Sequence, residues 1–469
     1  MFDVLVIGAG PAGIVAALRA AELGARTALV TRGDFGGMAA NDGPIPVRTL
    51  AHAARLLRDA RQLARYGIAV AEPALNYSGL LARAREVVGT VRTHSTRRQD
   101  FDRLGITVHE RSGTVHFTDA HTLESAQSLR LQAERIILCT GGTSRRLAVP
   151  GFELTATHSD AWALTSVPAS MLVVGGGATG LQVASIFSDF GTQVQLFQSG
   201  PRILAGEDAE VSAAVAAAFR QRGISVREDF GAIESFARVP QGVRMNFTKN
   251  GQREGAEAAL AVIAVGWVAD TAGLELPAAG VQSDARGFVA VDAFQRTSAP
   301  HVFAAGDITG RLMLVPQALQ AGFVAATNAV RGPILPLAQA VTPIGSFTDP
   351  EYAQVGMTEA QAREHHEIVI AKVPFETTTR TIIDGRTEGF CKLIVDRATR
   401  RILGCHVVGE RAVDITQVAA VAMTANMPVE QLAQIPLSFP TYAGVIGRAA
   451  YGAGRQLGLD INQRLHQES

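Results

Sequence analysis

Two sets of glycines have the spacing of a loop that binds the phosphate groups of a dinucleotide. Such glycines let the backbone turn tightly and approach a pyrophosphate, and the helix that follows offers unpaired N–H groups and the positive end of its dipole. The sets are Gly8, Gly10 and Gly13, enclosing Pro11 and Ala12, and Gly175, Gly177 and Gly180, enclosing Thr179. The spacing therefore predicts two dinucleotide sites in one chain.

Two dinucleotides in one chain suggest electron transfer between them. A nicotinamide gives up electrons in pairs, as hydride, and a flavin accepts such a pair and passes it on singly or together. We therefore expect FAD in one site and NADH or NADPH in the other.

Each loop needs a buried strand before it and a helix after it. Val4–Ile7 and Ile14–Leu23 supply them for the first loop, and Thr27–Val30 reads as the next strand. The pattern returns with the strand Leu172–Val174, an apolar helix and the strand Val194–Phe197. This internal repeat predicts an α/β protein with two Rossmann-like dinucleotide-binding domains.

The last part of the sequence changes character from about Val341. Lys392–Val395 and Ile402–Val408 alternate like a hairpin, and Val413–Ala425 and Val429–Ala433 have helical patterns. These features predict a separate α+β domain. We expect residues 1–148 and 271–340 to form the FAD-binding domain, residues 149–270 the NAD(P)-binding domain and residues 341–469 the α+β domain.

The composition argues against several classes of protein. The 43 Lys and Arg residues balance 43 Asp and Glu residues, so no excess charge favours nucleic acid or an anionic membrane. Three cysteines in 469 residues are too few for a disulfide framework, which fits a reducing compartment. Since no apolar run could span a membrane and no targeting segment is evident, we expect a cytoplasmic protein.

The cysteines and one basic helix have plain structural interpretations. The spacing of Cys139, Cys391 and Cys405 fits no metal or redox motif, so we expect buried thiols and no metal site. The helical pattern over Thr49–Tyr66 places arginines on one face, which we interpret as a solvated face. They are Arg55, Arg58, Arg61 and Arg65.

Beyond the glycine loops, an ordered set of short motifs extends over nearly the whole chain. The motifs are Gly36-Gly37, Ile45-Pro46, Thr140-Gly141, Ala305–Asp307, Phe347–Glu351, Val355-Gly356, Ile402–Gly404 and Pro440-Thr441. With them the chain closely resembles the FAD-dependent pyridine nucleotide–disulfide oxidoreductases, which include glutathione reductase, dihydrolipoamide dehydrogenase and mercuric reductase. The resemblance implies that the first loop holds FAD and that the last domain mediates formation of a homodimer.

The resemblance also implies positions for the cofactor contacts. Asp307 would bind the ribityl chain of the flavin, and Leu314–Ala318 would lie beside the isoalloxazine. The remaining FAD contacts would be Thr31, Arg32, Gly37, Met38, Thr140, Gly141, Gly306 and, within 314–318, Leu314, Val315, Pro316 and Ala318. In the NAD(P) site, Gln198 and Gly266 would join the second loop.

The chain departs from this family at the residues that handle sulfur. The two positions of the redox-active cysteine pair hold Ala39 and Pro44, and neither side chain can form a thiolate. The partner chain normally supplies a His–Glu acid–base pair, and those positions hold Phe439 and Gly444. A dithiol substrate needs a base to generate its thiolate, so these combined losses argue against reduction of disulfides or of mercury.

Three further departures concern the cofactors. The Lys–Glu pair often found between flavin and nicotinamide is replaced by Arg48 and Gln182, which could hydrogen-bond each other. Arg48 could also stabilise negative charge on reduced flavin or substrate, or could be a plain surface arginine. The acid that usually holds the adenosine ribose of FAD is replaced by Thr31, a weaker partner. Gln198 indicates neither NAD nor NADP clearly, with a slight preference for NADH.

These observations predict an FAD-dependent NAD(P)H oxidoreductase with a small-molecule acceptor other than a disulfide. The acceptor face would be apolar, which suits a quinone-like compound. Tyr442 of the partner subunit could donate a proton to it, or could simply pack at the subunit interface. The alternatives are transhydrogenation between NADH and NADP⁺, and a flavin-binding sensor subunit without turnover.

Overall fold

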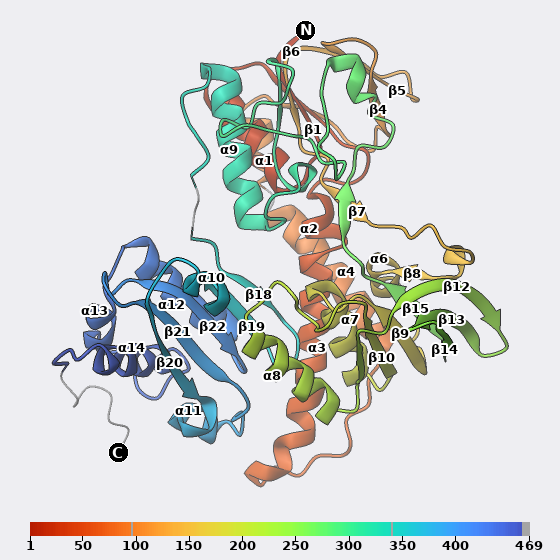
Figure 1. Cartoon of the computed structure of the whole chain (residues 1–469). Helices are drawn as coiled ribbons and strands as arrows, with labels where there is room; N and C mark the ends of the chain where they lie inside the picture. Colours follow the sequence, from red (N-terminus) through yellow and green to blue (C-terminus); the bar gives the residue numbers. More distant parts are fainter. Residues whose placement is uncertain (95–96, 339–340, 462–469) are drawn as a thin grey trace.

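The computed structural model describes residues 1–94, 97–338 and 341–461. These residues form three lobes, each built on its own sheet (Figure 1). The first sheet lies at the top, the second at the lower right and the third at the lower left of that view. We call them the first, second and third lobe.

The first lobe places the first glycine loop at the end of a buried parallel strand. Its strands run in the order β3-β2-β1-β6-β5-β4, and β17 pairs with β6. Helices α1 (Pro11–Glu22) and α9 (Val315–Arg331) pack side by side on one face (Figure 1). The strands are β1 (Phe2–Ile7), β2 (Thr27–Val30), β3 (Thr107–His109), β4 (Val115–Phe117), β5 (Thr122–Ser125), β6 (Arg130–Leu138) and β17 (Val302–Ala304).

The second lobe repeats this arrangement around the second loop. Its parallel sheet has the order β11-β10-β9-β15-β8, with helices α6, α7 and α8 and an antiparallel sheet β12-β13-β14. The bounds are β8 (Ala156–Thr157), α6 (His158–Trp162), β9 (Ser170–Val174), α7 (Ala178–Asp189), β10 (Gln193–Gln198), α8 (Ala209–Gln221), β11 (Ser225–Glu228), β12 (Ala232–Val239), β13 (Gly242–Lys249), β14 (Gln252–Ala258) and β15 (Leu260–Ile263). The predicted pair of Rossmann-like units is therefore present.

The third lobe is an antiparallel sheet of order β18-β19-β22-β21-β20 with helices against one face. The predicted hairpin is its centre, because β21 pairs with β22 along nearly their whole length. The bounds are β18 (Ile344–Ser346), β19 (Tyr352–Gly356), α10 (Glu359–Arg363), β20 (Ile368–Pro374), α11 (Thr379–Ile383), β21 (Phe390–Asp396), β22 (Ile402–Val408), α12 (Ala412–Thr424), α13 (Val429–Gln434) and α14 (Gly444–Gln456).

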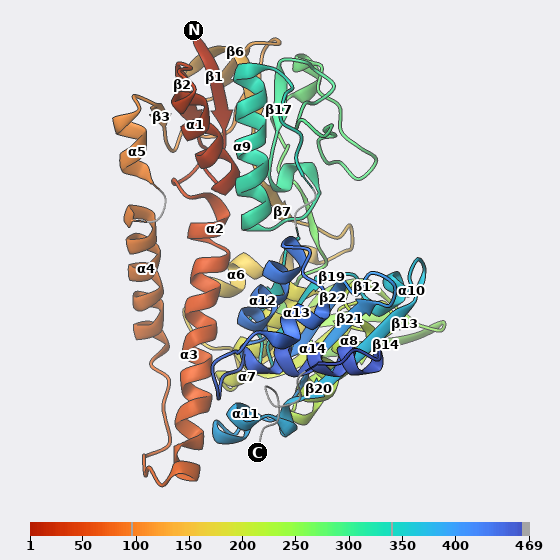
Figure 2. The ribbon, with the colours of Figure 1, turned by 90° about the vertical axis from the view of Figure 1, so that its left-hand side faces the viewer.

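Two segments connect the first lobe to the others. Helix α3 (Pro44–Gln62) descends from the short helix α2 (Gly37–Asn41) toward the lower lobes, with α4 (Tyr77–His94) beside it and α5 (Arg98–Arg103) above α4 (Figure 2). The strands β7 (Gly142–Ser144) and β16 (Trp267–Ala269) pair antiparallel where the chain passes between the first and second sheets. This β7–β16 ribbon joins the two glycine-loop units.

The predicted solvated face of Thr49–Tyr66 is only partly solvated: Arg61 and Arg65 are exposed, whereas Arg55 and Arg58 meet acidic partners, which corrects our interpretation for these two. Arg58 is largely buried and forms ion pairs with Asp189 of the second lobe and, at 2.7 Å, with Asp349 of the third. Arg55 pairs with Glu410 at 2.5 Å. The charge pattern of α3 could not distinguish a solvated face from one that meets acidic partners distant in sequence.

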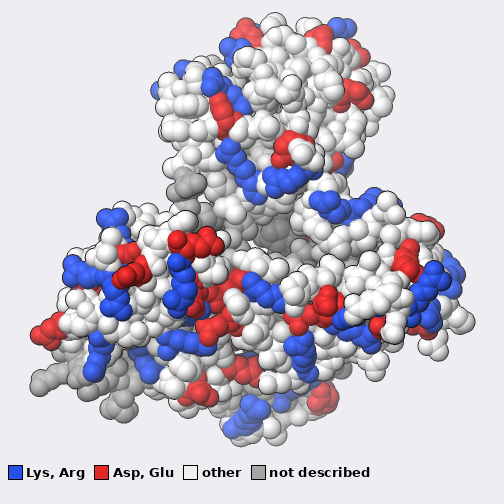
Figure 3. All heavy atoms as spheres, in the orientation of Figure 1, with Lys and Arg blue, Asp and Glu red and all other residues white. Residues whose placement is uncertain are grey.

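Neither a membrane-spanning helix nor a metal-binding group of side chains is found among the described residues. Within the three described ranges, every helix is too short or too polar to cross a bilayer. In the same ranges, no group of three or more His, Cys, Asp or Glu side chains could hold a metal ion. Figure 3 shows both signs of charge interspersed over one face, with a hollow between the first lobe and the two lower ones.

Candidate active site

In the first glycine loop, two glycines leave no room for a side chain and the third does. Gly8 has a φ of +107°, and a Cβ there would overlap the carbonyl oxygen of Cys139. A Cβ on Gly13 would overlap the carbonyl oxygen of Gly8, so these two glycines close the turn and seat α1 on the sheet. A Cβ on Gly10 would meet nothing within 4 Å. This open position at the helix N-terminus leaves room for a pyrophosphate to approach the backbone.

The second loop repeats this geometry. Gly175 has a φ of +114°, and a Cβ there would overlap the carbonyl oxygen of Ala264. A Cβ on Gly180 would overlap the carbonyl oxygen of Gly175. A Cβ on Gly177 would meet nothing within 4 Å, as is the case for Gly10 in the first loop. The two loops therefore repeat the same backbone conformation as well as the same glycine spacing. Each can accommodate an anionic group in the same way.

The second loop opens into a cavity of about 730 Å³. A dinucleotide-sized ligand fits such a volume, which lies within the usual range for cofactor sites. The lining comprises Ser144, Arg145, Leu147, Val149, His158, Val174, Gly175, Gly176, Gly177, Ala178, Thr179, Phe197, Gln198, Ser199, Phe230, Gly231, Ile233, Ala264, Val265, Gly266 and Trp267. Gln198 and Gly266, both predicted, are among these residues.

The predicted flavin contacts gather around the first turn of α1. A Cβ on Gly306 would lie 3.1 Å from the Cβ of Ala12, so the Gly306-Asp307 turn sits against that helix. Burial raises the pKa of Asp307. A half-buried carboxylate is stabilised when it accepts hydrogen bonds from hydroxyl groups. The ribityl chain of FAD would offer such groups here. The residues present therefore fit FAD.

The predicted FAD residues Thr140 and Gly141 also help to fasten the β7–β16 ribbon. The Thr140 hydroxyl donates to the carbonyl of Asp270 at 2.7 Å, and the amide of Asp270 donates to the carbonyl of Gly141 at 3.0 Å. The Asp270 carboxylate forms an ion pair with Arg32 at 2.9 Å. These contacts join the end of β6 to the end of β16.

The other predicted FAD residues border the same loop. Thr31, at the end of β2, is 8% exposed, and its backbone bonds His109 and Ser112. A Cβ on Gly37 would be 2.5 Å from the Cα of Gly10, so α2 starts directly against the open glycine, with Met38 next in the helix. Helix α9 begins after Leu314 with Val315 and Pro316, and Ala318 in its first turn is buried.

Arg48 and Gln182 are brought together from α3 and α7. The Arg48 Nη1 donates to the Gln182 Oε1 at 2.5 Å, so the expected hydrogen bond is present. The guanidinium carbon lies 3.4 Å from the ring centroid of Phe347, which the sequence did not predict as its partner. Burial lowers the pKa of Arg48 to about 10, so the side chain remains cationic at neutral pH. Arg48 is thus a fixed positive charge where α3 meets the second and third lobes.

The positions of the family's cysteines lie at the break between α2 and α3. Ala39 is within α2, and Pro44 is the first residue of α3. The three cysteines of the chain lie elsewhere and are buried as free thiols. Burial raises the pKa of Cys139 to about 12, which keeps this thiol protonated and unreactive.

Tyr442 lies in the third lobe, and its hydroxyl is occupied. It donates to Asp384 Oδ2 at 2.8 Å, and burial together with this carboxylate raises the pKa of Tyr442. Phe439 nearby is 67% exposed. Within the described part of one chain, the side-chain contacts of Tyr442 and those of Arg48 have no residue in common, so the predicted role of Tyr442 requires a second subunit.

Sequence reasoning missed the polar side chains at the inner end of the cavity. His158 and Ser144 line it beside Trp267, and the rings of His158 and Trp267 meet edge to face at 4.7 Å. Each residue lies in a short element without a motif. The one available signal was a histidine at the start of a helix directly before the second repeat.

Comparison with known proteins identifies the family to which the chain belongs. The sequence profile "Pyridine nucleotide-disulphide oxidoreductase" matches residues 2–322, and the profile of that family's dimerisation domain matches residues 342–450. The chain belongs to this family. Members bind FAD and use NAD(P)H, and the third lobe of the chain is the dimerisation domain.

Relatives in this family match along almost the entire chain. The dihydrolipoyl dehydrogenase of Zymomonas mobilis is 32% identical over 464 residues, covering 96% of this chain and 98% of that protein. A dihydrolipoyl dehydrogenase of Haloarcula marismortui is 33% identical, covering 96% of both chains. The mercuric reductase of Lysinibacillus sphaericus is 29% identical, covering 96% of this chain and 82% of that protein.

A solved structure confirms the fold. The HOCl-induced flavoprotein disulfide reductase RclA from Escherichia coli superposes with a TM-score of 0.85 at 24% identity, covering 96% of this chain and 99% of that chain. The predicted α/β class, with two Rossmann-like domains followed by a dimerisation domain, is thereby confirmed.

Proposed function

We propose that the protein is an FAD-dependent NAD(P)H oxidoreductase that passes electrons to a quinone-like acceptor rather than to a disulfide. One observation carries this proposal: both glycine loops keep their geometry, whereas Ala39, Pro44, Phe439 and Gly444 stand where sulfur chemistry needs two thiols and a base. The nucleotide side of the family's reaction is thus retained, and the thiol relay is lost.

The chain's own residues supply binding and charge in this reaction. When bound at the first loop, FAD supplies a carrier for electron pairs. The Arg48 guanidinium, held by Gln182 and stacked on Phe347, provides a cation that favours negative charge developing beside it. Because a guanidinium does not readily deprotonate, Arg48 acts as a fixed charge and not as an acid.

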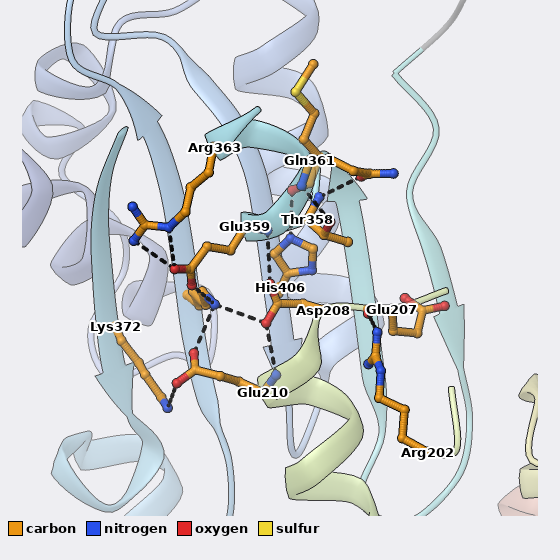
Figure 4. A network of polar contacts seen from close by, with 12 residues as sticks. Arg202, Glu207, Asp208, Glu210, Thr358, Glu359, Gln361, Arg363, Lys372 and His406 are labelled. Carbon is orange, nitrogen blue, oxygen red and sulfur yellow. Dashed lines mark hydrogen bonds and ion pairs between the residues drawn. The ribbon is translucent and has the colours of Figure 1, made fainter. Parts of the chain in front are cut away.

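The contacts around Gln198 favour NADH over NADPH. The Gln198 Oε1 accepts from the amide of Gly176 at 2.8 Å, which holds its amide group beside the loop as a neutral partner for a ribose. Arg202, the arginine that follows Gln198 in the sequence, donates at 2.9 Å to the carbonyl of Ala205 and, as Figure 4 shows, to that of Glu207. With that guanidinium engaged by its own loop, a free ribose hydroxyl suits the site better than a phosphate does.

The acceptor side would be mainly apolar. Met38, Ala39 and Pro44 line the segment that carries the cysteines in the family, and Phe439 and Tyr442 of the partner subunit would complete it. A flat, weakly polar ring system fits such a surface, and two electrons with two protons convert a quinone into a quinol.

The test is stopped-flow spectroscopy of the purified flavoprotein under anaerobic conditions. We expect NADH to bleach the flavin faster than NADPH, with no long-wavelength band from a thiolate, and a quinone panel to reoxidise it faster than oxygen does. Dihydrolipoamide should leave the flavin oxidised. Turnover of this dithiol, or reoxidation by quinones no faster than by oxygen, would refute the proposal.

Two other outcomes would identify the alternatives. Equal bleaching by NADH and NADPH, followed by reoxidation with NADP⁺, would indicate transhydrogenation. A bound flavin that neither nucleotide bleaches would indicate a sensor subunit without turnover.

A further inference from the structure

A chain of four hydrogen-bonding side chains leads from the inner end of the nucleotide cavity to the break between α2 and α3. The Ser144 Oγ lies 3.0 Å from His158 Nδ1, and His158 Nε2 lies 3.3 Å from the Ser159 Oγ. The Ser159 hydroxyl donates to Asp42 Oδ2 at 2.5 Å. Asp42 belongs to the segment between the two helices, and Ser144 and His158 line the cavity.

Burial favours the neutral form of the imidazole in this hydrogen-bonded series. His158 is 5% exposed, and burial lowers its pKa despite the nearby carboxylates of Asp42 and Asp160. Asp160 is engaged at the start of α6, where it accepts from the amide of Thr157 at 2.7 Å. A neutral imidazole has one N–H group and one bare nitrogen, so its two neighbours must differ in role.

The carboxylate fixes the direction of every bond. Asp42 can only accept, so the single proton of Ser159 points at it. Ser159 must then accept from His158 Nε2–H, which leaves His158 Nδ1 bare. The bare nitrogen accepts the proton of Ser144, and the Ser144 oxygen therefore faces the cavity with lone pairs and no proton to give.

The position along the cavity indicates which part of a nucleotide would meet this oxygen. Gln198 ends β10 and bonds the amide of Gly176, and Phe230 follows β11, so these lining residues lie on the side of the second loop, where the pyrophosphate would bind. Ser144 and Trp267 belong to the β7–β16 ribbon that leads to the first lobe. Hydride must travel toward the first lobe, so the nicotinamide end of the nucleotide lies at the ribbon.

We propose that Ser144 is a specificity-determining residue that accepts a hydrogen bond from the carboxamide N–H of the nicotinamide, with His158 and Ser159 as positioning residues and Asp42 as the fixed end. The inference rests on the proposed function, because it requires a nicotinamide nucleotide in this cavity. These four side chains lie outside both glycine loops.

The test compares three oxidised nucleotides, none of which needs turnover. NAD⁺ has the carboxamide N–H, its 3-acetylpyridine analogue has a carbonyl but no N–H, and nicotinic acid adenine dinucleotide has a carboxylate. Quenching of tryptophan fluorescence, through Trp267 in the cavity lining, gives each Kd. For the wild type we expect NAD⁺ to bind about 3- to 10-fold more tightly than the acetyl analogue, as one neutral hydrogen bond would give, and the acid to bind most weakly.

Two variants distinguish a direct contact of Ser144 with the nucleotide from an effect that reaches Ser144 through the hydrogen-bonded side chains. Ser144→Ala should bring the Kd ratio of the acetyl analogue to NAD⁺ close to one. Asp42→Asn is nearly isosteric and lies outside the cavity lining, yet its amide can donate as well as accept, so the direction of the bonds is no longer fixed and Ser144 can also donate. We expect this variant to lose discrimination against the carboxylate analogue. Thr143→Ala, an exposed neighbour on the same strand, is the matched control and should behave as the wild type.

The outcomes distinguish this inference from the proposed function. If NAD⁺ binds but Ser144→Ala leaves the ratio unchanged, or if the wild type does not discriminate, the inference is wrong and the proposed function stands. If no nucleotide quenches the fluorescence of the flavin-loaded protein, both are wrong. Thermal unfolding and bound-flavin content of each variant show that it has folded.

Discussion

At the scale of single residues, Arg48 is a buried charged side chain of the connecting helix α3 that contacts both the second and the third lobe. It lies on α3, bonds Gln182 of α7 and stacks on Phe347, which precedes β19. Replacement by methionine removes the charge and the donors but retains much of the packing volume. We expect Arg48→Met to slow reoxidation by a quinone about 10- to 100-fold, since a charge-assisted hydrogen bond contributes about 1.5–3 kcal/mol.

Substitution of Gln182, the hydrogen-bond partner of Arg48, provides the comparison for the reoxidation rate. Gln182→Leu removes one neutral acceptor and leaves the cation, so reoxidation should slow by no more than about 10-fold. Stopped-flow mixing of prereduced protein with quinone measures both rates. Equal rates in Arg48→Met and the wild type would remove Arg48 from the reaction and leave it a structural role.

The open glycines provide a second prediction at this scale. Gly10 and Gly177 have φ values of −77° and −88°, which alanine adopts readily, and a methyl group would touch no protein atom. Either substitution should therefore leave the fold intact and place a methyl group where a phosphate approaches. We expect Gly10→Ala to purify without flavin, and Gly177→Ala to keep its flavin but bind NADH at least about 10-fold more weakly, as loss of one charged contact would give.

The measurements are the absorbance spectrum and the nucleotide Kd of each variant. Gly13→Ala is the contrasting substitution, because its methyl group would overlap the carbonyl oxygen of Gly8 and should lower the melting temperature. A Gly10→Ala protein with a full complement of FAD would contradict the assignment of the first loop.

At the scale of elements, a buried lysine joins α8 of the second lobe to the third lobe. Lys392 on β21 is 1% exposed, and its ammonium contacts Asp208, Glu210 and Glu359 at 3.0, 3.0 and 2.7 Å. Figure 4 shows the surrounding carboxylates converging from α8 and α10, with His406 of β22 beside them. The ammonium is fully partnered, so removing it leaves buried Asp208 without its cation.

Removal of this ammonium should destabilise the contact between the lobes. We expect Lys392→Met to lower the free energy of unfolding by about 3–5 kcal/mol, the range for breaking a buried ion pair. Lys372→Met is the matched control: its ammonium bonds Glu210 at 3.0 Å but is 40% exposed, and it should lose less than about 1 kcal/mol. Denaturant unfolding followed by circular dichroism measures both, and similar losses in the two variants would contradict the argument.

The elements that the sequence predicted well are those whose signal is local. Apolar runs and glycine spacing predict the strand, loop and helix at residues 4–23 and again from residue 172. Alternation of apolar and polar residues predicts the β21–β22 hairpin. The contacts that it missed join distant segments. Arg58 meets Asp189 and Asp349, and His158 lies beside Trp267, because the lobes pack together, and no spacing along the chain records that packing.

At the scale of the whole molecule, the third lobe has exposed apolar side chains of the kind that a subunit interface covers. Phe439, Val421, Ile382 and Ile383 are each more than half exposed, and all lie within the matched dimerisation domain. Large apolar groups in contact with water favour association that buries them. We therefore expect a homodimer in solution, with Phe439 near the acceptor site of the other subunit.

The last prediction separates assembly from nucleotide chemistry. Both glycine loops lie in one chain, so a monomer should still bind FAD and be bleached by NADH, whereas the acceptor site would lack Phe439 and Tyr442 of the partner subunit. We expect Phe439→Asp to shift the protein to monomer in multi-angle light scattering and to suppress quinone reduction much more than flavin bleaching. Ile334→Asp, at an apolar position outside the dimerisation domain that is 61% exposed, should change neither property. A monomeric variant with full quinone turnover would show that each chain holds a complete acceptor site.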